Sequence, residues 1–362
     1  MTIDGAGEGR FNTRTSKPPD IVLAKAPREQ GPPAAGMSHL PARLRLRAIQ
    51  MLVLATLGWS VSFATSKALV LAQQQLLPAS NTWFLSSYTL TWRFGIAALV
   101  MLLWHRHEVP QMTRLEWRQS LGLGLFGGVG MVFQMDGLPY VPASTSAFLT
   151  QFYCLLIPLW IAFRRWQWPR PIVFASSFMV LAGVAILSGL NWREMNLGRG
   201  ELETLLGSVF FTGQILWLER PEFAANRMGP VTGVMFGVLT LVCLPVALAN
   251  TQQAGDWLRA MSTWPIGLFL GTLILVCTLY SFSIMNYWQR HVTATEAGLI
   301  YCLEPVFASL FALFLPAWLS RLAAIPYTNE IVTWHLLAGG GLITAANLLL
   351  HVKTFYDTPT GA

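Results

Sequence analysis

Charged side chains are scarce in this chain. They make up 11% of its 362 residues, against about 25% in soluble globular domains, whereas hydrophobic residues make up 54%. This composition excludes an ordinary soluble domain. The formal net charge of +7 is spread over short gaps between apolar segments, so we expect no nucleic-acid partner.

Groups that carry catalysis or bind metals are also sparse. No Ser-His-Asp set, metal-ligand cluster or phosphate loop is visible, so we expect a protein that is not an enzyme and holds no metal or cofactor. The cysteines all lie in apolar segments without metal-ligand spacing, and we expect them to be packing residues: Cys154, Cys243, Cys277 and Cys302.

One motif resembles a nucleotide site but lies in the wrong context. Residues 122–127 match Gly-x-Gly-x-x-Gly, a fingerprint that needs a strand before it and a helix opening after it. Here the glycines fall within an apolar segment. Gly124 and Gly128 are expected instead to let two helices approach closely.

Long apolar segments are what the chain does contain. A hydrocarbon core about 30 Å thick needs about 20 apolar residues of helix, and backbone groups in lipid are satisfied only within helices or closed barrels. We therefore predict an all-α membrane protein with ten transmembrane helices. Their expected bounds are 48–70, 83–104, 119–137, 142–163, 172–190, 201–219, 231–249, 265–288, 294–316 and 332–350.

The distribution of Lys and Arg predicts the orientation. Of the 24 basic residues, 18 lie in the two tails and in every second gap, four lie in the other gaps, and Lys67 and Arg93 lie within spans. Positive charge marks the cytoplasmic side, so both termini are predicted to be cytoplasmic. Arg43, Arg45 and Arg47 then lie where anionic headgroups would hold them.

The two halves of the chain are similar to each other. A shift of about 150 residues places the fourth span on the ninth, where the matching pairs are Thr145 and Thr295, Ala147 and Ala297, and Leu149 and Leu299. In the preceding spans Met135 matches Met285. Each half has five spans. Because five is odd, the halves must have opposite orientations in the membrane, an arrangement typical of alternating-access transporters.

These patterns predict four parts of the chain. Residues 1–45 are expected to be a disordered cytoplasmic tail, because they are rich in Pro, Gly, Ser and charge. Two inverted five-helix repeats are expected at 46–190 and 199–351, and a second cytoplasmic tail at 352–362.

Several short motifs resemble the drug/metabolite transporter (DMT) superfamily, in particular a protein with two EamA-type domains. The resemblance covers about residues 48–350. The motifs are Trp59-Ser60-Val61-Ser62-Phe63 followed by Lys67, Trp92-Arg93-Phe94, residues 147–153 followed by Pro158, residues 200–205, Leu303-Glu304-Pro305-Val306 and residues 337–343.

The resemblance implies ten helices, cytoplasmic termini, and efflux or exchange of small metabolites or drugs without an ATP site. The sequence departs from the family pattern after the fourth and ninth spans, where Gly-Glu-Arg is often found and Phe163-Arg164-Arg165 and Leu315-Pro316-Ala317 stand here. The first span also lacks the carboxylate that the small multidrug-resistance branch uses for proton exchange.

Glu304 is the foremost candidate for a functional side chain. An ionisable group at bilayer depth costs about 2.5–3.5 kcal/mol on insertion scales, and Glu304 lies near the middle of the ninth span. Pro305 removes a backbone donor from the carbonyl of Tyr301 and crowds it. Glu304 is predicted either to bind a proton or cation during transport or to form a structural ion pair with Arg93 or Lys67.

Five further side chains are candidates for substrate binding or coupling. Arg93 could bind a carboxylate or phosphate through its fork of donors, or cap carbonyls between helices. Lys67 could instead extend to the outer headgroups. Gln151, predicted to line a central cavity beside Glu304, Tyr153 as an aromatic wall, and Asn286 complete the set.

The resulting functional hypothesis is a secondary transporter of the bacterial inner membrane, with small-molecule substrate and membrane lipids as partners and as monomer or homodimer. Export of a small metabolite or drug-like solute by alternating access is expected, with proton or cation coupling. An integral-membrane enzyme and a non-transporting partner or sensor subunit are the alternatives. The enzyme would need clustered His and acidic groups, and the sensor would need soluble domains or long ordered loops.

Overall fold

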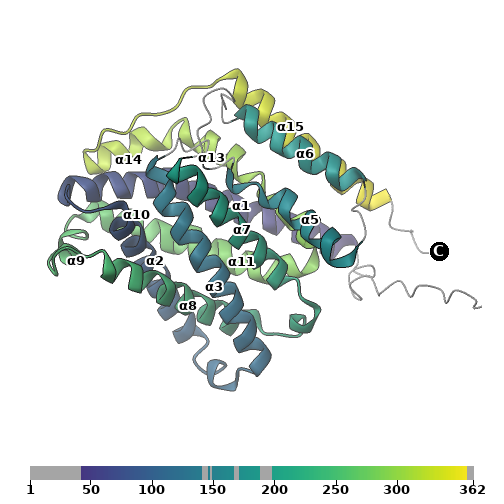
Figure 1. Cartoon of the computed structure of the whole chain (residues 1–362), viewed down its shortest axis with the longest axis horizontal. Coiled ribbons are helices and arrows are strands. Elements are labelled where there is room, and N and C mark those ends of the chain that lie inside the picture. Colours follow the sequence, from purple (N-terminus) through teal and green to yellow (C-terminus); the bar gives the residue numbers. More distant parts are fainter. Residues whose placement is uncertain (1–41, 141–145, 147–148, 167–170, 188–197, 357–362) are drawn as a thin grey trace, which may run out of the picture. The chain divides into compact units, whose positions relative to one another are not determined.

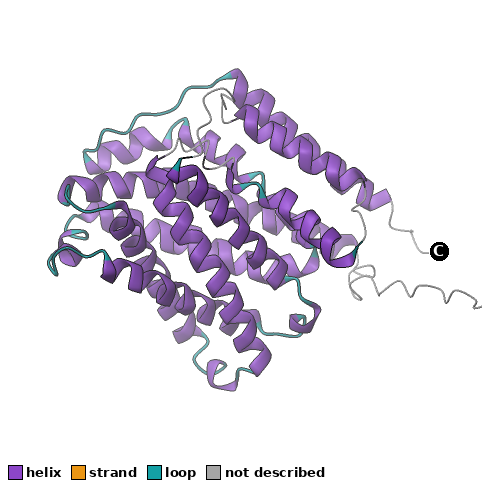
Figure 2. Ribbon diagram, in the orientation of Figure 1, coloured by secondary structure: helices purple, strands orange, loops and turns teal. Residues whose placement is uncertain are grey.

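The computed structural model describes residues 42–140, 146, 149–166, 171–187 and 198–356. Contacts divide the chain into units of residues 1–35 and 36–362, and every described residue falls in the second. All regular elements in this described part are helices, and it contains no strand (Figures 1 and 2). The expected all-α class is therefore confirmed.

Five helical stretches are long and apolar enough to cross a membrane by composition. They are Arg43–Leu76, Thr82–Trp104, Met228–Ala249, Trp264–His291 and Ala294–Ala312. Shorter apolar helices lie at Tyr153–Arg164, Pro171–Ile186 and Leu337–Ala346. Each of the ten predicted spans overlaps a described helix.

Helices α2 (Thr82–Trp104), α3 (Arg114–Gly137) and α8 (Met228–Ala249) pack along one another. Glycines allow α3 to approach α8 closely, as the sequence predicted. A Cβ added at Gly124 would lie 2.5 Å from the Cβ of Val238 and 2.9 Å from the Met235 carbonyl oxygen.

On its other side α3 packs against α7 (Arg199–Leu218). Gly130 and Gly207 lie at this contact, and a Cβ on Gly207 would come within 3.1 Å of the Gly130 carbonyl oxygen. α6 (Pro171–Leu187) and α15 (Trp334–Tyr356) form a second close pair, which runs side by side in Figure 1.

Helix α1 (Ala42–Leu76) is the longest described element. It begins before residue 46, so residues 42–45 of the expected disordered tail are helical. Along its length α1 contacts the eighth and ninth predicted spans, and its residues Ala48, Leu52 and Ala55 are fully buried.

Three predicted spans are not single regular α-helices. The eighth consists of α10 (Trp264–Thr272), the π-helix η4 (Leu273–Tyr280) and α11 (Ser281–Trp288). The ninth consists of α12 (Ala294–Tyr301) and α13 (Glu304–Ala312), separated by a turn at residues 302–303. In the fourth, a turn at residues 151–152 precedes α5 (Tyr153–Arg165).

Residues 317–331, which lie between the ninth and tenth predicted spans, are partly helical. α14 (Leu315–Ala323) buries Pro316 and Leu319 and exposes Trp318. The remaining short helices are η1 (Val109–Gln111), η2 (Leu138–Tyr140), η3 (Pro221–Phe223), α9 (Asp256–Arg259) and η5 (Gln289–His291).

Candidate functional site

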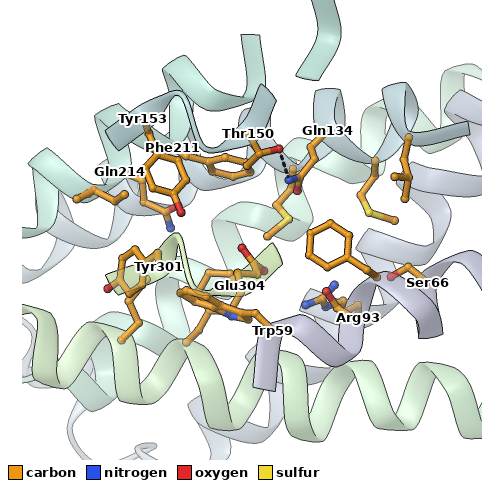
Figure 3. Close-up of a pocket in the computed structure, with 18 residues that line it drawn as sticks. Trp59, Ser66, Arg93, Gln134, Thr150, Tyr153, Phe211, Gln214, Tyr301 and Glu304 are labelled. Carbon is orange, nitrogen blue, oxygen red and sulfur yellow. Dashed lines mark hydrogen bonds between the residues drawn. The ribbon is translucent and has the colours of Figure 1, made fainter. Parts of the chain in front are cut away.

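A pocket lies between the helices, with walls drawn from seven of the predicted spans (Figure 3). The empty space between its side chains is about 820 Å³, including the part open to solvent. The lining residues are Trp59, Ser62, Phe63, Ser66, Arg93, Met131, Gln134, Met135, Leu138, Thr150, Tyr153, Phe211, Gln214, Ile215, Phe282, Met285, Tyr301 and Glu304.

Glu304 is the only acidic side chain among these lining residues, and it begins α13. The interruption before α13 follows from Pro305, which stands in the first turn, where its missing N–H leaves no hydrogen bond unmade. The Ser60 hydroxyl lies 3.0 Å from the Glu304 carbonyl oxygen and 2.8 Å from the Thr56 carbonyl oxygen, so its single proton is shared between the two acceptors. The Glu304 side chain extends between Tyr301 and Trp59 on one side and Tyr153 and Phe211 on the other (Figure 3).

Within the described residues the Glu304 carboxylate forms neither a hydrogen bond nor an ion pair. Arg93 lines the same pocket, but no ion pair within 4.0 Å joins the two groups. The direct pairing of Glu304 with Arg93 or Lys67 that the sequence left open is thus not formed. A carboxylate without a partner is available to an incoming ligand or proton.

Arg93 is held by the π-helix. Its Nε donates to the Thr278 hydroxyl at 2.6 Å and its Nη2 to the Cys277 carbonyl oxygen at 3.3 Å. A π-helix bonds each carbonyl to the fifth residue on, and such segments are frequent at functional sites. Arg93 is 3% exposed, so these bonds stabilise its charge and fix its position at the pocket edge.

The fourth span contributes Thr150 and Tyr153 to the pocket, but not Gln151. Gln151 is fully buried, it is not among the lining residues, and neither of its side-chain amide atoms has a partner among described residues. The turn at residues 151–152 explains the difference, because it changes the helical phase that the sequence implied.

Lys67 and Asn286 also lie away from the pocket lining. Lys67 is exposed, and its Nζ lies 5.6 Å from the ring centre of Tyr327. Asn286 is fully buried and donates to the Thr232 hydroxyl at 2.9 Å. Of the six candidates, Glu304, Arg93 and Tyr153 are brought together, whereas Lys67, Gln151 and Asn286 are not.

Sequence reasoning missed several polar groups of the pocket. Gln134 donates to Thr150 at 3.0 Å, while the Nε2 of Gln214 and the indole Nε1 of Trp59 are buried without partners in the described chain. One signal was present in the repeat, since the matching pair Met135 and Met285 both line the pocket.

Comparison with known proteins shows which family part of the chain is similar to. Residues 46–189 match the EamA-like transporter family. Over this first part, the chain is therefore similar to EamA-like transporters. It is also similar to a protein of Archaeoglobus fulgidus described as an uncharacterized transporter, with 24% identity over 224 residues that cover 61% of this chain and 66% of the relative. This match therefore spans just under two thirds of the relative's length.

A solved crystal structure shares the fold. It aligns with a TM-score of 0.59 at 19% sequence identity, covering 86% of this chain and 98% of the other. Together with the apolar helices, the family match makes this chain a multi-pass membrane protein.

At the end of α3 that follows the pocket, an ionic cluster is centred on Arg199. This residue pairs with Asp136 of α3 and donates to Glu203 at 2.8 Å and to the Tyr140 hydroxyl at 2.7 Å. Asp136 is fully buried and directly follows Met135 of the pocket. The cluster therefore connects the end of α3 to the start of α7.

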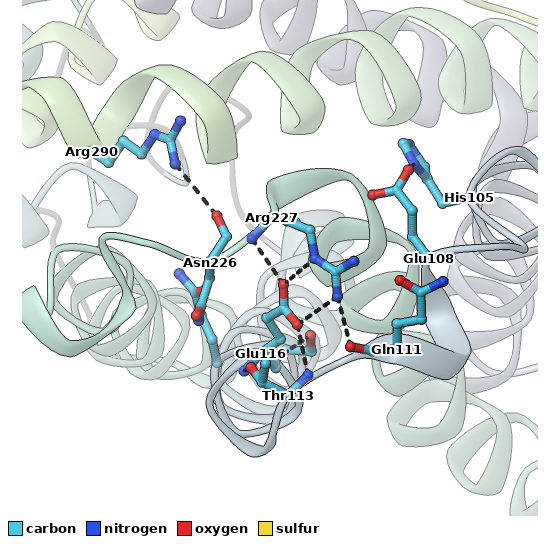
Figure 4. Close-up of polar contacts among 10 residues, drawn as sticks. His105, Glu108, Gln111, Thr113, Glu116, Asn226, Arg227 and Arg290 are labelled. Atoms are coloured by element: carbon cyan, nitrogen blue, oxygen red, sulfur yellow. Dashed lines mark hydrogen bonds and ion pairs between the residues drawn. The ribbon is translucent and has the colours of Figure 1, made fainter.

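A second cluster joins the other end of α3 to the start of α8 (Figure 4). Glu116 forms a capping box with Thr113 and accepts from the Arg227 Nε at 2.8 Å and Nη2 at 3.0 Å. These hydrogen bonds from Arg227 lower the pKa of Glu116 from 4.5 to about 2, against the opposing effect of burial. The same pairing raises the pKa of Arg227.

Proposed function

We propose that this protein is a secondary transporter and that the pocket around Glu304 is its substrate site. The observation that carries this proposal is a carboxylate without a partner in a pocket whose walls come from seven predicted spans. A charged group at membrane depth is retained where it faces a cavity, and such groups mark substrate and ion pathways.

The proposal includes ten helices arranged as two inverted repeats, residues 46–190 and 199–351. Two matched features support it. The fourth and ninth spans are both interrupted, at residues 151–152 and 302–303, and a tyrosine beside each interruption, Tyr153 and Tyr301, lines the pocket. Discontinuous helices at the repeat interface are typical of substrate sites in transporters with inverted repeats.

In this scheme the protein exports a small metabolite or drug-like solute across the bacterial inner membrane by alternating access, with both termini cytoplasmic. Glu304 is the coupling carboxylate, which binds a proton or cation. Arg93 and Tyr153 contact the solute. Gln151, Lys67 and Asn286 remain proposed contributors, and their positions outside the lining give them a role only in another access state.

Transport by the purified protein in liposomes tests the proposal. A metabolite library is first screened for compounds that raise the Tm, and uptake of those compounds is then measured with and without a pH gradient. Glu304→Gln is expected to abolish gradient-driven uptake while it leaves the Tm within a few degrees. Glu330→Gln is the matched control, because Glu330 is exposed and does not line the pocket. This variant should transport normally.

Two results would contradict the proposal. Full gradient-driven uptake by a stable Glu304→Gln variant would remove this carboxylate from coupling. Absence of any stabilising compound, with no uptake in either direction, would instead favour the non-transporting partner or sensor subunit.

A further inference from the structure

The first turns of α1 carry three arginines in two different environments. Arg45 pairs with Glu296, the capping acid of α12, and its side chain is 20% exposed. Arg43 and Arg47 are exposed, and neither forms an ion pair with a described residue. Two positive charges therefore remain unneutralised at this end of α1.

Helix geometry separates the two environments. Residues four apart lie on the same face of a helix, about 5–6 Å apart at Cβ, so Arg43 and Arg47 are neighbours. Arg45 is two residues from each, and positions two apart do not share a face. It extends instead toward Glu296, whose second carboxylate oxygen already accepts from the Thr293 N–H at 2.9 Å.

Two arginines lie against aromatic side chains that directly precede the connection between α11 and α12. The guanidinium of Arg47 lies 5.6 Å from the ring centre of Trp288, and that of Arg290 lies 4.8 Å from the ring centre of Tyr287. Arg290 donates to the Asn226 carbonyl oxygen at 3.5 Å (Figure 4) but forms no ion pair within the described chain. Tyr287 is 46% exposed.

We propose that Arg43 and Arg47, with Trp288, bind the phosphate headgroup of an anionic phospholipid. Two neighbouring guanidinium groups without acidic partners favour a phosphate, which the arginine fork recognises with two donors. Aromatic rings of this kind lie at headgroup level. Between Gln50 and Lys67 the exposed residues of α1 are Leu54 and Leu57, so acyl chains have an apolar surface to follow. The charge count predicts that this end faces the cytoplasmic leaflet, which is rich in anionic lipid.

Titration of lipid into the full-length protein in detergent tests the site. The Tm is measured against the concentration of phosphatidylglycerol, of phosphatidylcholine with the same acyl chains, and of soluble glycerol 3-phosphate. Phosphatidylglycerol alone is expected to raise the Tm. The double variant Arg43→Gln and Arg47→Gln should bind phosphatidylglycerol about 10- to 30-fold more weakly, because each arginine near the membrane surface contributes a similar factor to the affinity for anionic lipid.

The matched control removes two charges elsewhere on the same predicted side. Arg106 and Arg114 are exposed and lie outside this site, so the double change of both to Gln should leave the affinity within about twofold. Equal losses in the two double variants would overturn the proposal in favour of general charge attraction. Equal stabilisation by phosphatidylcholine or by glycerol 3-phosphate would overturn it as well. None of these outcomes depends on which solute is transported.

Discussion

At the scale of single residues, the most unusual side chain is Gln151, a buried amide whose two polar atoms have no partner among described residues. An unsatisfied buried polar group costs roughly 1–3 kcal/mol. Gln151→Leu should therefore raise the Tm in detergent. If the variant is more stable and still transports, the Gln151 amide takes no part in transport. Loss of transport would instead give this amide a role in another access state.

Gln289 provides the contrast for that experiment. It is equally buried, but its Nε2 donates to the Ile215 carbonyl oxygen at 3.0 Å and its Oε1 accepts from the Tyr301 hydroxyl at 2.8 Å. Gln289→Leu leaves both partners unsatisfied and should destabilise the protein by roughly 2–4 kcal/mol. A lower Tm for both variants would contradict the assignment of Gln151 as unpartnered.

Glu116 predicts a dependence of stability on pH. Because its folded pKa is about 2 and its ordinary value is 4.5, its contribution is full above pH 4.5 and is lost as the pH falls toward 2. Glu116→Gln should lower the free energy of unfolding by roughly 1.5–3 kcal/mol at pH 7, and this difference should shrink across that window.

The control for Glu116 is Glu222, which pairs with Arg118 and Arg220 at the surface with 39% of its side chain exposed. Exposed pairs contribute about 0–1 kcal/mol, so Glu222→Gln should have little effect at any pH. A Tm difference for Glu116→Gln that does not change between pH 5 and pH 2.5 would argue against the paired carboxylate.

At the scale of elements, the crossing of α3 and α8 depends on a position without a side chain. Gly124→Ala would place a methyl group 2.9 Å from the Met235 carbonyl oxygen, and overpacking of this kind costs roughly 1–3 kcal/mol. Gly237 is on α8 itself, and a Cβ there would meet nothing within 4 Å. Gly237→Ala should therefore stabilise by about 0.5–1 kcal/mol. Equal Tm changes in the two variants would contradict the close crossing.

Continuous spans were predictable from the sequence because apolar length alone specifies them. The second span was expected at 83–104 and α2 is Thr82–Trp104, and the third and sixth agree similarly. The interrupted spans were not predictable to the same degree. Pro305 signalled a disturbed carbonyl, but a kink in one helix and a break between two helices have the same sequence signature. The π-helix had no signal, since its residues 273–280 are uniformly apolar apart from Thr278.

For the candidate site, too, some residues were predictable from the sequence and others were not. Glu304 and Arg93 were found because charge within an apolar run is conspicuous. Gln134, Thr150 and Gln214 were missed because uncharged polar residues are common in spans and usually serve packing. Gln151 was placed beside Glu304 by assuming an unbroken fourth helix, and the turn at 151–152 directs Thr150 and Tyr153 to the pocket instead.

At the scale of the whole molecule, the expected orientation can be tested with two single cysteines. Thr328 is exposed in the connection after α14, and Arg114 is exposed at the start of α3. The four native cysteines are buried. On intact cells an impermeant thiol reagent should label Thr328→Cys and not Arg114→Cys. The reverse pattern would invert the topology and move the proposed lipid site to the outer leaflet.

The uncharged stretch of helix α1 matches a particular thickness of the surrounding bilayer. Arg47 and Lys67 are 20 residues apart with no charge between them, which is about 30 Å at 1.5 Å per residue and equals the thickness of a typical hydrocarbon core. A thicker bilayer would draw one of these charges toward the acyl chains, and a thinner one would make the helix tilt. Arg47 contacts Trp288 at one end of this uncharged stretch, and Lys67 contacts Tyr327 at the other. The stability of the protein should therefore depend on bilayer thickness and be greatest in bilayers whose hydrocarbon core is about 30 Å thick.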